Sequence, residues 1–129
     1  MTKSIQQLFD LAGRTAIVTG GGTHLGKAFT ETLCELGAKV YIASRRYELC
    51  EQVAYRLRDQ GMDVTAMGCD VTDESQVDAL VDRVMNENDR LDIAICNAGG
   101  SFTTSYPPNG DIDEFRRTLD VNLTGTYIT

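Results

Sequence analysis

The fold is decided by residues 15–26, which read TAIVTGGGTHLG. The first five residues are apolar or β-branched, which is typical of a buried strand, and the three glycines that follow predict a tight turn. Apolar side chains then recur at helical spacing, and Gly37 follows as a stop signal. These side chains are Leu25, Phe29, Leu33 and Leu36. A strand, a tight turn and a helix are therefore predicted in that order.

The same order recurs along the rest of the chain. Three further apolar runs predict strands, at residues 40–43, 64–69 and 91–96. Three further amphipathic stretches predict helices, at residues 49–57, 77–84 and 115–126. Capping spacings, Asp73 to Gln76 and Asp111 to Glu114, mark where the last two helices begin.

Four strands that alternate with four helices predict right-handed βαβ units. We therefore expect an α/β fold with a Rossmann-like, doubly wound parallel sheet, of which the first four βα units are present. In such a sheet a ligand binds beyond the carboxyl ends of the strands, where the strand order reverses. The strand-to-helix turns are the places to look for functional residues.

Composition narrows the function. The 129 residues carry 12 Lys and Arg against 19 Asp and Glu, a net charge of -7, which argues against nucleic acid or an anionic membrane as partner. No apolar stretch is long enough to span a bilayer, and the first residues lack the apolar core of a signal peptide, so a cytoplasmic protein is expected. Four cysteines without a C-x-x-C pair, and one histidine, predict free thiols and no metal site.

The first turn has the features of a phosphate cradle. It fits T-G-x-x-x-G-x-G, with His24 at the middle glycine, whereas the G-x-G-x-x-G spacing fails at Leu25. Backbone N–H groups and the helix dipole can hold a diphosphate here, although a plain tight turn is the alternative. The Cβ of His24 restricts φ and crowds a phosphate, or its imidazole donates to a phosphate oxygen. The candidate residues are Gly20, Gly22, Thr23, His24, Leu25 and Gly26.

The second turn indicates which dinucleotide is bound. A fold that prefers NAD offers Asp or Glu to the ribose 2′-hydroxyl about 20 residues beyond the glycine-rich turn. This chain offers Ser44, Arg45 and Arg46 instead. A hydroxyl and guanidinium groups bind a 2′-phosphate through charge-assisted hydrogen bonds, so NADP(H) is favoured as the cofactor.

The turns and the last helix together resemble those of the short-chain dehydrogenase/reductase family. The matching motifs are the glycine-rich turn, Ser44-Arg45-Arg46, Asp70-Val71, Asn97-Ala98-Gly99 and Val121-Asn122. They occur in the family's order across residues 15–129, and residues 9–14 look like the family's lead-in. The lead-in and the glycine-rich turn look most like those of the family's sugar-acid and polyol dehydrogenases, such as gluconate dehydrogenase-like members, although 3-oxoacyl reductases share these features.

The resemblance implies roles for the remaining motifs. Asp70 and Val71 would contact the adenine, although Asp70 is also a plausible neighbour of a helix cap. Asn97, Ala98 and Gly99 would border the cofactor, with Asn97 steadying the sheet. Asn122 would be catalytic, by holding a water in the family's proton relay; an asparagine satisfied by backbone groups is the alternative.

The family's catalytic tyrosine and lysine are spaced Y-x-x-x-K, and no tyrosine of this chain has a lysine four places later. In the family this pair and the catalytic serine follow the segment that holds Asn122. Residues 1–129 are therefore expected to be the truncated, NADP-binding Rossmann half of a single-domain oxidoreductase.

The expected reaction is hydride transfer between NADP(H) and a small carbonyl or alcohol substrate. The alternative is a non-catalytic NADP(H)-binding module. The resemblance also implies a homo-oligomer, a dimer or tetramer, formed partly through the helix that bears Phe115 and Asn122.

Overall fold

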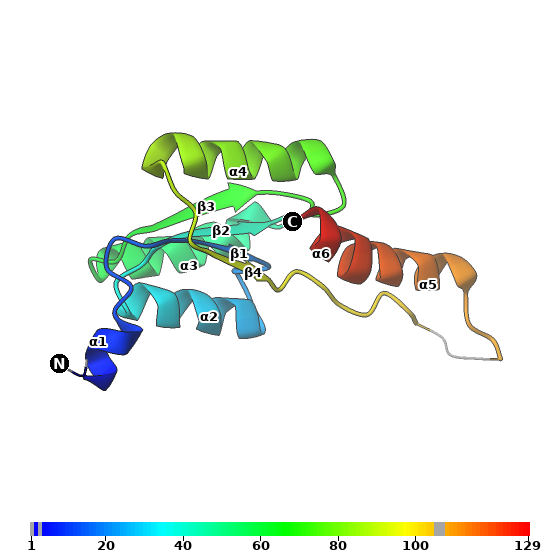
Figure 1. Ribbon diagram of the computed structural model, residues 1–129. Coiled ribbons are helices and arrows are strands. Elements are labelled where there is room, and N and C mark those ends of the chain that lie inside the picture. The colour runs from blue at the N-terminus through cyan, green and yellow to red at the C-terminus, as the bar shows by residue number, and fades with distance from the viewer. Residues whose placement is uncertain (1, 3, 105–107) are drawn as a thin grey trace.

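The computed structural model describes residues 2, 4–104 and 108–129 and contains a four-stranded parallel sheet (Figure 1). The strands are β1 (Thr15–Thr19), β2 (Lys39–Ser44), β3 (Val64–Gly68) and β4 (Ile93–Cys96), in the order β3-β2-β1-β4. The order reverses between β1 and β4, which is where a ligand crevice is expected. The prediction of a Rossmann-like α/β fold is confirmed.

The helices alternate with the strands. They are α1 (Ile5–Phe9), α2 (His24–Glu35), α3 (Tyr47–Asp59), α4 (Glu74–Asn88), α5 (Ile112–Leu119) and α6 (Gly125–Ile128). A π-helical segment, η1 (Asp120–Thr124), joins α5 to α6. Figure 1 shows α4 over one face of the sheet and α2 beneath the other.

Alternate residues of β1 pack into two separate apolar cores, one on each face of the sheet. Ala16 and Val18 are buried among side chains of α2 and α3, including Leu33 and Val53. Ile17 points the other way, into a cluster with Val77, Leu80 and Val84 of α4. Because both faces of the central strands are covered, β1 is buried along its whole length, as a parallel sheet requires.

The inward face of α2 differs from the one that the apolar spacing indicates. Leu25 and Phe29 are 66% and 38% exposed, and the buried residues of the helix are Gly26, Thr30, Leu33 and Cys34. The reason is the close approach of Gly26 to the carbonyl of Gly20, which turns the small side of the helix toward the sheet.

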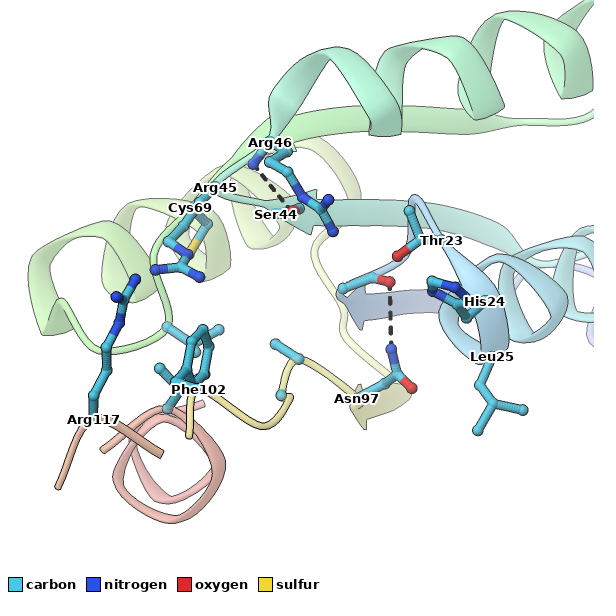
Figure 2. Close-up of a pocket in the computed structure, with 15 residues that line it drawn as sticks. Thr23, His24, Leu25, Ser44, Arg45, Arg46, Cys69, Asn97, Phe102 and Arg117 are labelled. Atoms are coloured by element: carbon cyan, nitrogen blue, oxygen red, sulfur yellow. Dashed lines mark hydrogen bonds between the residues drawn. The ribbon is translucent and has the colours of Figure 1, made fainter. Parts of the chain in front are cut away.

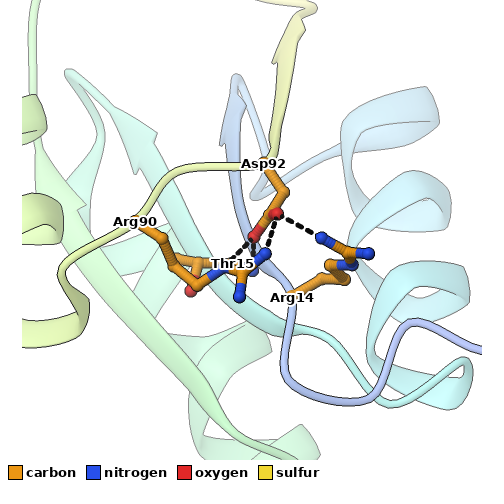
Figure 3. Close-up of polar contacts among 4 residues, drawn as sticks. All are labelled: Arg14, Thr15, Arg90 and Asp92. Atoms are coloured by element: carbon orange, nitrogen blue, oxygen red, sulfur yellow. Dashed lines mark hydrogen bonds and ion pairs between the residues drawn. The ribbon is translucent and has the colours of Figure 1, made fainter.

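Asp92 joins the start of β4 to the start of β1 (Figure 3). Its carboxylate accepts hydrogen bonds from Arg90 Nε at 2.8 Å, Thr15 N at 2.9 Å and Arg14 Nη1 at 2.9 Å. These partners, Arg90 foremost, hold the pKa of Asp92 far below its usual range. Strand β4 begins at Ile93, two residues later than predicted, because the side chain of Asp92 binds Thr15, Arg14 and Arg90 just before the strand.

The last helical stretch leaves an apolar stripe uncovered. In the part of the chain that the structure describes, Figure 1 shows α5 extending beyond the edge of the sheet. The exposed large side chains along this stretch are Ile112, Phe115, Leu119, Leu123 and Tyr127. Its inner side is anchored by Val121, which is buried, and by Gly125, where a Cβ would lie 2.6 Å from Val71 Cγ2.

The four cysteines are free, and all but Cys96 are buried. Burial raises the pKa of Cys34 and of Cys50 to about 11, so both thiols are protonated at neutral pH. Among the described residues, no three His, Cys, Asp or Glu side chains gather where they could hold a metal ion. Within the same residues, every helix is too short or too polar to cross a bilayer.

Candidate functional site

A cavity of about 520 Å³ lies at the switch point, beyond the carboxyl ends of the strands. Figure 2 shows side chains entering it from the turns after β1 and β2, from the segment after β4 and from α5. The lining residues are Gly20, Thr23, His24, Leu25, Ser44, Arg45, Arg46, Cys69, Val71, Asn97, Ala98, Gly99, Phe102, Arg117 and Val121. Residues that follow all four strands therefore meet at one site.

The β1–α2 turn owes its shape to close contacts between backbone groups. Gly20 has φ +67°, a conformation that side chains with a Cβ rarely adopt. A Cβ on Gly26 would overlap the carbonyl oxygen of Gly20 and lie 2.6 Å from Asn97 Nδ2. The side chain of Asn97 donates to the carbonyls of Thr19 at 3.1 Å and Gly20 at 3.3 Å. These contacts fix the turn against the end of β4.

His24 occupies the position of the middle glycine with φ +46°, which is also left-handed. Histidine is one of the few side chains that enter this region with some frequency. The residue is exposed and its side chain lines the cavity. From the sequence, we expect the Cβ of His24 to restrict φ. The backbone nevertheless keeps the left-handed conformation that a glycine would adopt here.

The first N–H groups of α2 face this turn. The N-terminal N–H groups of any helix lack partners inside the helix, and the side chain of the N-cap residue Thr23 supplies no capping hydrogen bond within the described residues. An anion placed at the turn would therefore meet free N–H donors and the positive end of the helix dipole.

The β2–α3 turn brings two guanidinium groups to the cavity. Ser44 Oγ accepts a hydrogen bond from the backbone N–H of Arg46 at 3.1 Å, which shapes the turn. Arg45 and Arg46 are both exposed and both line the cavity. No carboxylate is found among the described residues that line it, so its electrostatic potential favours an anion.

The carboxylate of Asp70 lies outside the cavity lining and accepts hydrogen bonds from Thr72. Burial raises its pKa, but the hydrogen bonds from Thr72 N at 3.0 Å and Thr72 Oγ1 at 2.8 Å, and the charge of Arg45, lower it by more. Asp70 is thus ionised and turned toward Thr72 at the start of α4.

Most of the predicted site residues line the cavity, but four do not: Gly22, Gly26, Asp70 and Asn122. The two glycines are packing positions, since a Cβ on Gly22 would lie 2.9 Å from the backbone nitrogen of Cys50. Three lining residues had no sequence signal, namely Cys69, Phe102 and Arg117, and a fourth, Val121, belongs to the Val121-Asn122 motif but was not predicted to line the site. Of these, Arg117 and Phe102 follow from contacts between distant segments.

Asn122 holds the segment after β4. Its Oδ1 accepts from Gly100 N at 3.0 Å, and its Nδ2 donates to Gly100 O at 2.7 Å and Thr118 O at 2.7 Å. A Cβ on Gly99 would clash with this amide. All three of these hydrogen bonds go to backbone groups, as the alternative in the sequence analysis expects, and one lone pair of Oδ1 is left for a further donor. Asn122 lies in η1, a helix type often found at functional sites.

Two more side chains of the same helix repeat this arrangement. Thr118 Oγ1 accepts from Phe102 N at 3.2 Å, and Glu114 accepts from Thr104 N at 2.8 Å. Residues 114, 118 and 122, one helical turn apart, thus bind alternate residues 104, 102 and 100. We call these contacts the polar ladder. It holds residues 100–104 along the helix and so fixes the position of Phe102 relative to Arg117.

The residues present fit a dinucleotide. The cradle at Gly20 and Gly26 has no room for a Cβ, α2 presents its N–H groups there, and the basic lining suits several phosphates. The cavity volume is within the range of cofactor pockets.

The comparisons with known proteins agree with this geometry. A sequence model of the short chain dehydrogenase family matches residues 14–129. Galactitol 2-dehydrogenase of Rhizobium johnstonii is 38% identical over 126 residues, 96% of this chain and 48% of that protein.

Two solved structures share the fold. A short-chain type dehydrogenase/reductase from Mycobacterium marinum matches with a TM-score of 0.92 and 35% identity, over 98% of this chain and 49% of that one. The Pseudomonas aeruginosa RhlG/NADP active-site complex matches with a TM-score of 0.84 and 32% identity, over 93% of this chain and 46% of that one. The chain thus spans about half the length of these relatives.

Proposed function

The chain belongs to the short chain dehydrogenase family, and from that premise we propose that its cavity binds NADP(H) in an oxidoreductase. Bound NADP(H) would supply or accept the hydride exchanged with the carbonyl or alcohol carbon of a small substrate. The residues described here would bind and orient the cofactor.

One observation carries the choice of NADP(H) over NAD(H). Arg45 and Arg46 line the cavity directly after β2, where an acidic residue would otherwise bind the ribose 2′-hydroxyl. In a chain of net charge -7, the charged side chains around this cavity are basic. The similar structure from Pseudomonas aeruginosa is an NADP complex, which supports the same choice.

Each part of the lining then has a proposed task. The N–H groups at the start of α2, with Thr23 and His24, would hold the diphosphate. Ser44, Arg45 and Arg46 would bind the 2′-phosphate. The remaining predicted residues, Asp70, Val71, Asn97, Ala98 and Gly99, would border the adenine and the nicotinamide half. Asn122 would order the backbone beside a proton relay.

The test replaces both arginines of the second turn. Losing charge-assisted hydrogen bonds in Arg45→Ala/Arg46→Ala should weaken NADPH binding by at least about tenfold. NADH should weaken by less than about threefold, because it lacks the 2′-phosphate. Arg56→Ala is the matched control, since Arg56 is exposed on α3, the helix that follows this turn, and lies outside the cavity lining. Equal losses for both cofactors in the double variant would remove the argument.

A non-catalytic NADP(H)-binding module is the second candidate for these 129 residues. This candidate applies to residues 1–129 alone, in which none of the five tyrosines is followed four places later by lysine. A turnover assay with NADPH and carbonyl substrates, run beside an NADPH titration of the same chain, separates the two. Binding without turnover supports the module, and turnover rules it out.

We also propose that a second copy of the chain covers the apolar stripe on α5 and η1. Leu119 and Leu123 are 43% and 66% exposed there. Sedimentation should show a dimer or tetramer, and Leu119→Glu/Leu123→Glu should convert it to a monomer. A wild-type chain that sediments as a monomer at all concentrations would contradict this proposal.

A further inference from the structure

Phe102 brings together two arginines from distant parts of the sequence. The guanidinium carbon of Arg45, at the end of β2, lies 5.8 Å from the centre of the Phe102 ring. That of Arg117, on α5, lies 4.7 Å from the same centre. Figure 2 shows Arg117 reaching from its helix toward Arg45, and all three side chains line the cavity. A third arginine therefore stands at the end of the cavity where β2 ends.

The polar ladder fixes this position. Phe102 N donates to Thr118 Oγ1 at 3.2 Å, and Thr118 is the neighbour of Arg117 in α5. The ladder bonds to Gly100 and Thr104 hold the segment on both sides of Phe102. The ring is thereby kept against Arg117, and a cation over an aromatic face is held by the negative potential of the ring.

The charge of Arg117 is not matched by a carboxylate in the cavity. Its neighbour Arg116 pairs with Asp113 at 3.1 Å, whereas among the described residues Arg117 forms no ion pair. Arg45 and Arg117 are like charges beside one ring, and they repel each other. An anion between them would relieve that repulsion and gain two planar, bidentate donors, which suit a phosphate.

We propose that Arg117 is a specificity-determining residue for the 2′-phosphate that distinguishes NADP(H) from NAD(H). It acts from α5, opposite Arg45, and Phe102 holds its guanidinium in place. The inference rests on the proposed NADP(H) function, and it adds a contact that no motif in the sequence signals. Selectivity for the phosphorylated ribose then depends on the docking of α5 as well as on the β2–α3 turn.

The experiment uses nucleotides that isolate the 2′-phosphate. The affinities of 2′,5′-ADP and 5′-AMP are measured by calorimetry for the wild type, Arg117→Ala and the matched control Arg116→Ala. Alanine is the better helix former, so Arg117→Ala should keep α5 folded, and circular dichroism checks this. We expect Arg117→Ala to weaken 2′,5′-ADP by about tenfold and 5′-AMP by less than about twofold. Arg116→Ala should change neither by more than about twofold.

Each other result has a definite meaning. If the wild type prefers 2′,5′-ADP and Arg117→Ala keeps that full preference, the role of Arg117 is refuted and the NADP(H) assignment stands. An equal loss for both nucleotides also refutes this role, because that would make Arg117 a general contact. A wild type that binds 5′-AMP as tightly as 2′,5′-ADP overturns the NADP(H) assignment, and this inference with it. Arg117→Lys keeps the charge and loses the planar guanidinium. Its affinity for 2′,5′-ADP should lie between those of the wild type and Arg117→Ala.

Discussion

Two segments border the cavity, and they are shaped in different ways. The β1–α2 turn, residues 19–26, is shaped by its own backbone, with Gly20 at φ +67° and Gly26 against the carbonyl of Gly20. The segment after β4, residues 97–104, is shaped by side chains of the helix that follows it, through the polar ladder. The glycines of the first segment set its shape, and Asn97 holds it against the end of β4. The shape of the second segment depends on side chains up to 22 positions away.

This difference predicts how each segment responds to substitution. The β1–α2 turn should tolerate no added atom at Gly26. In the polar ladder, each substitution should remove only the hydrogen bonds of the residue that is replaced. Four substitutions test this contrast, and their expected effects decrease in the order Gly26→Ala, Asn122→Ala, Thr118→Val and His24→Gly.

Gly26→Ala should have the largest effect. The new Cβ would overlap the Gly20 carbonyl and press on Asn97 Nδ2, so we expect about 3 kcal/mol of destabilisation by urea unfolding and loss of NADPH binding. Gly68→Ala is the control, because a Cβ there would have nothing within 4 Å. Equal stability of the two variants would show that the turn is not as tight as the contacts indicate.

Asn122→Ala should have an intermediate effect. It removes the amide that pairs with Gly100 and Thr118, at an exposed site, so we expect a loss of about 1 kcal/mol. Hydrogen exchange should quicken at the Gly100 amide and change little in the β1–α2 turn. Equal quickening in both segments would mean that the two are not independent.

Thr118→Val breaks only one bond of the ladder, to Phe102 N, and keeps the shape of the side chain. It should cost less than Asn122→Ala, and its faster exchange should be confined to residues near Phe102. Exchange that spreads to Gly100 would show that the ladder opens as a unit.

His24→Gly should have a small effect of the opposite sign. Glycine removes the cost of holding a side chain at φ +46°, so we expect stabilisation by about 0.5 kcal/mol, with His24→Ala less stable than His24→Gly. Urea unfolding of both variants measures this. A His24→Gly protein less stable than the wild type would indicate that the imidazole makes a stabilising contact.

A final substitution tests the strands that lead into the two segments. Asp92 joins the starts of β1 and β4, and its pKa in the folded protein is below the unfolded value of about 4. Its carboxylate therefore adds stability above about pH 4, and this is lost as the pH falls through the folded pKa. Asp92→Asn should lower the urea midpoint most near pH 7 and progressively less below pH 4. A difference that does not depend on pH would contradict the role of the charge.

The sequence predicted the parts that follow from local patterns. The four strands, their order of alternation with helices and the glycine-rich turn are each encoded in short stretches such as residues 15–26. Arg45 and Arg46 were predicted because they directly follow β2, at a fixed distance from that turn.

The parts it missed depend on contacts between distant residues. Phe102 and Arg117 line the cavity because the ladder bond from Phe102 to Thr118 joins residues 16 positions apart, and no periodicity signals that. The π-helical turn at Asp120–Thr124 interrupts a pattern that looked like one helix. Helix α1 was missed although Ser4 and Gln7 form a capping box, because its five residues are all exposed and carry no inward stripe.

We propose that the basic cavity at the switch point selects NADP(H). The most direct measurement is the ratio of the NADH and NADPH dissociation constants of the wild-type protein, determined by fluorescence titration in one buffer. Because Arg45 and Arg46 are proposed to bind the 2′-phosphate, NADPH should bind at least about tenfold more tightly. Equal affinities, or tighter binding of NADH, would contradict the account.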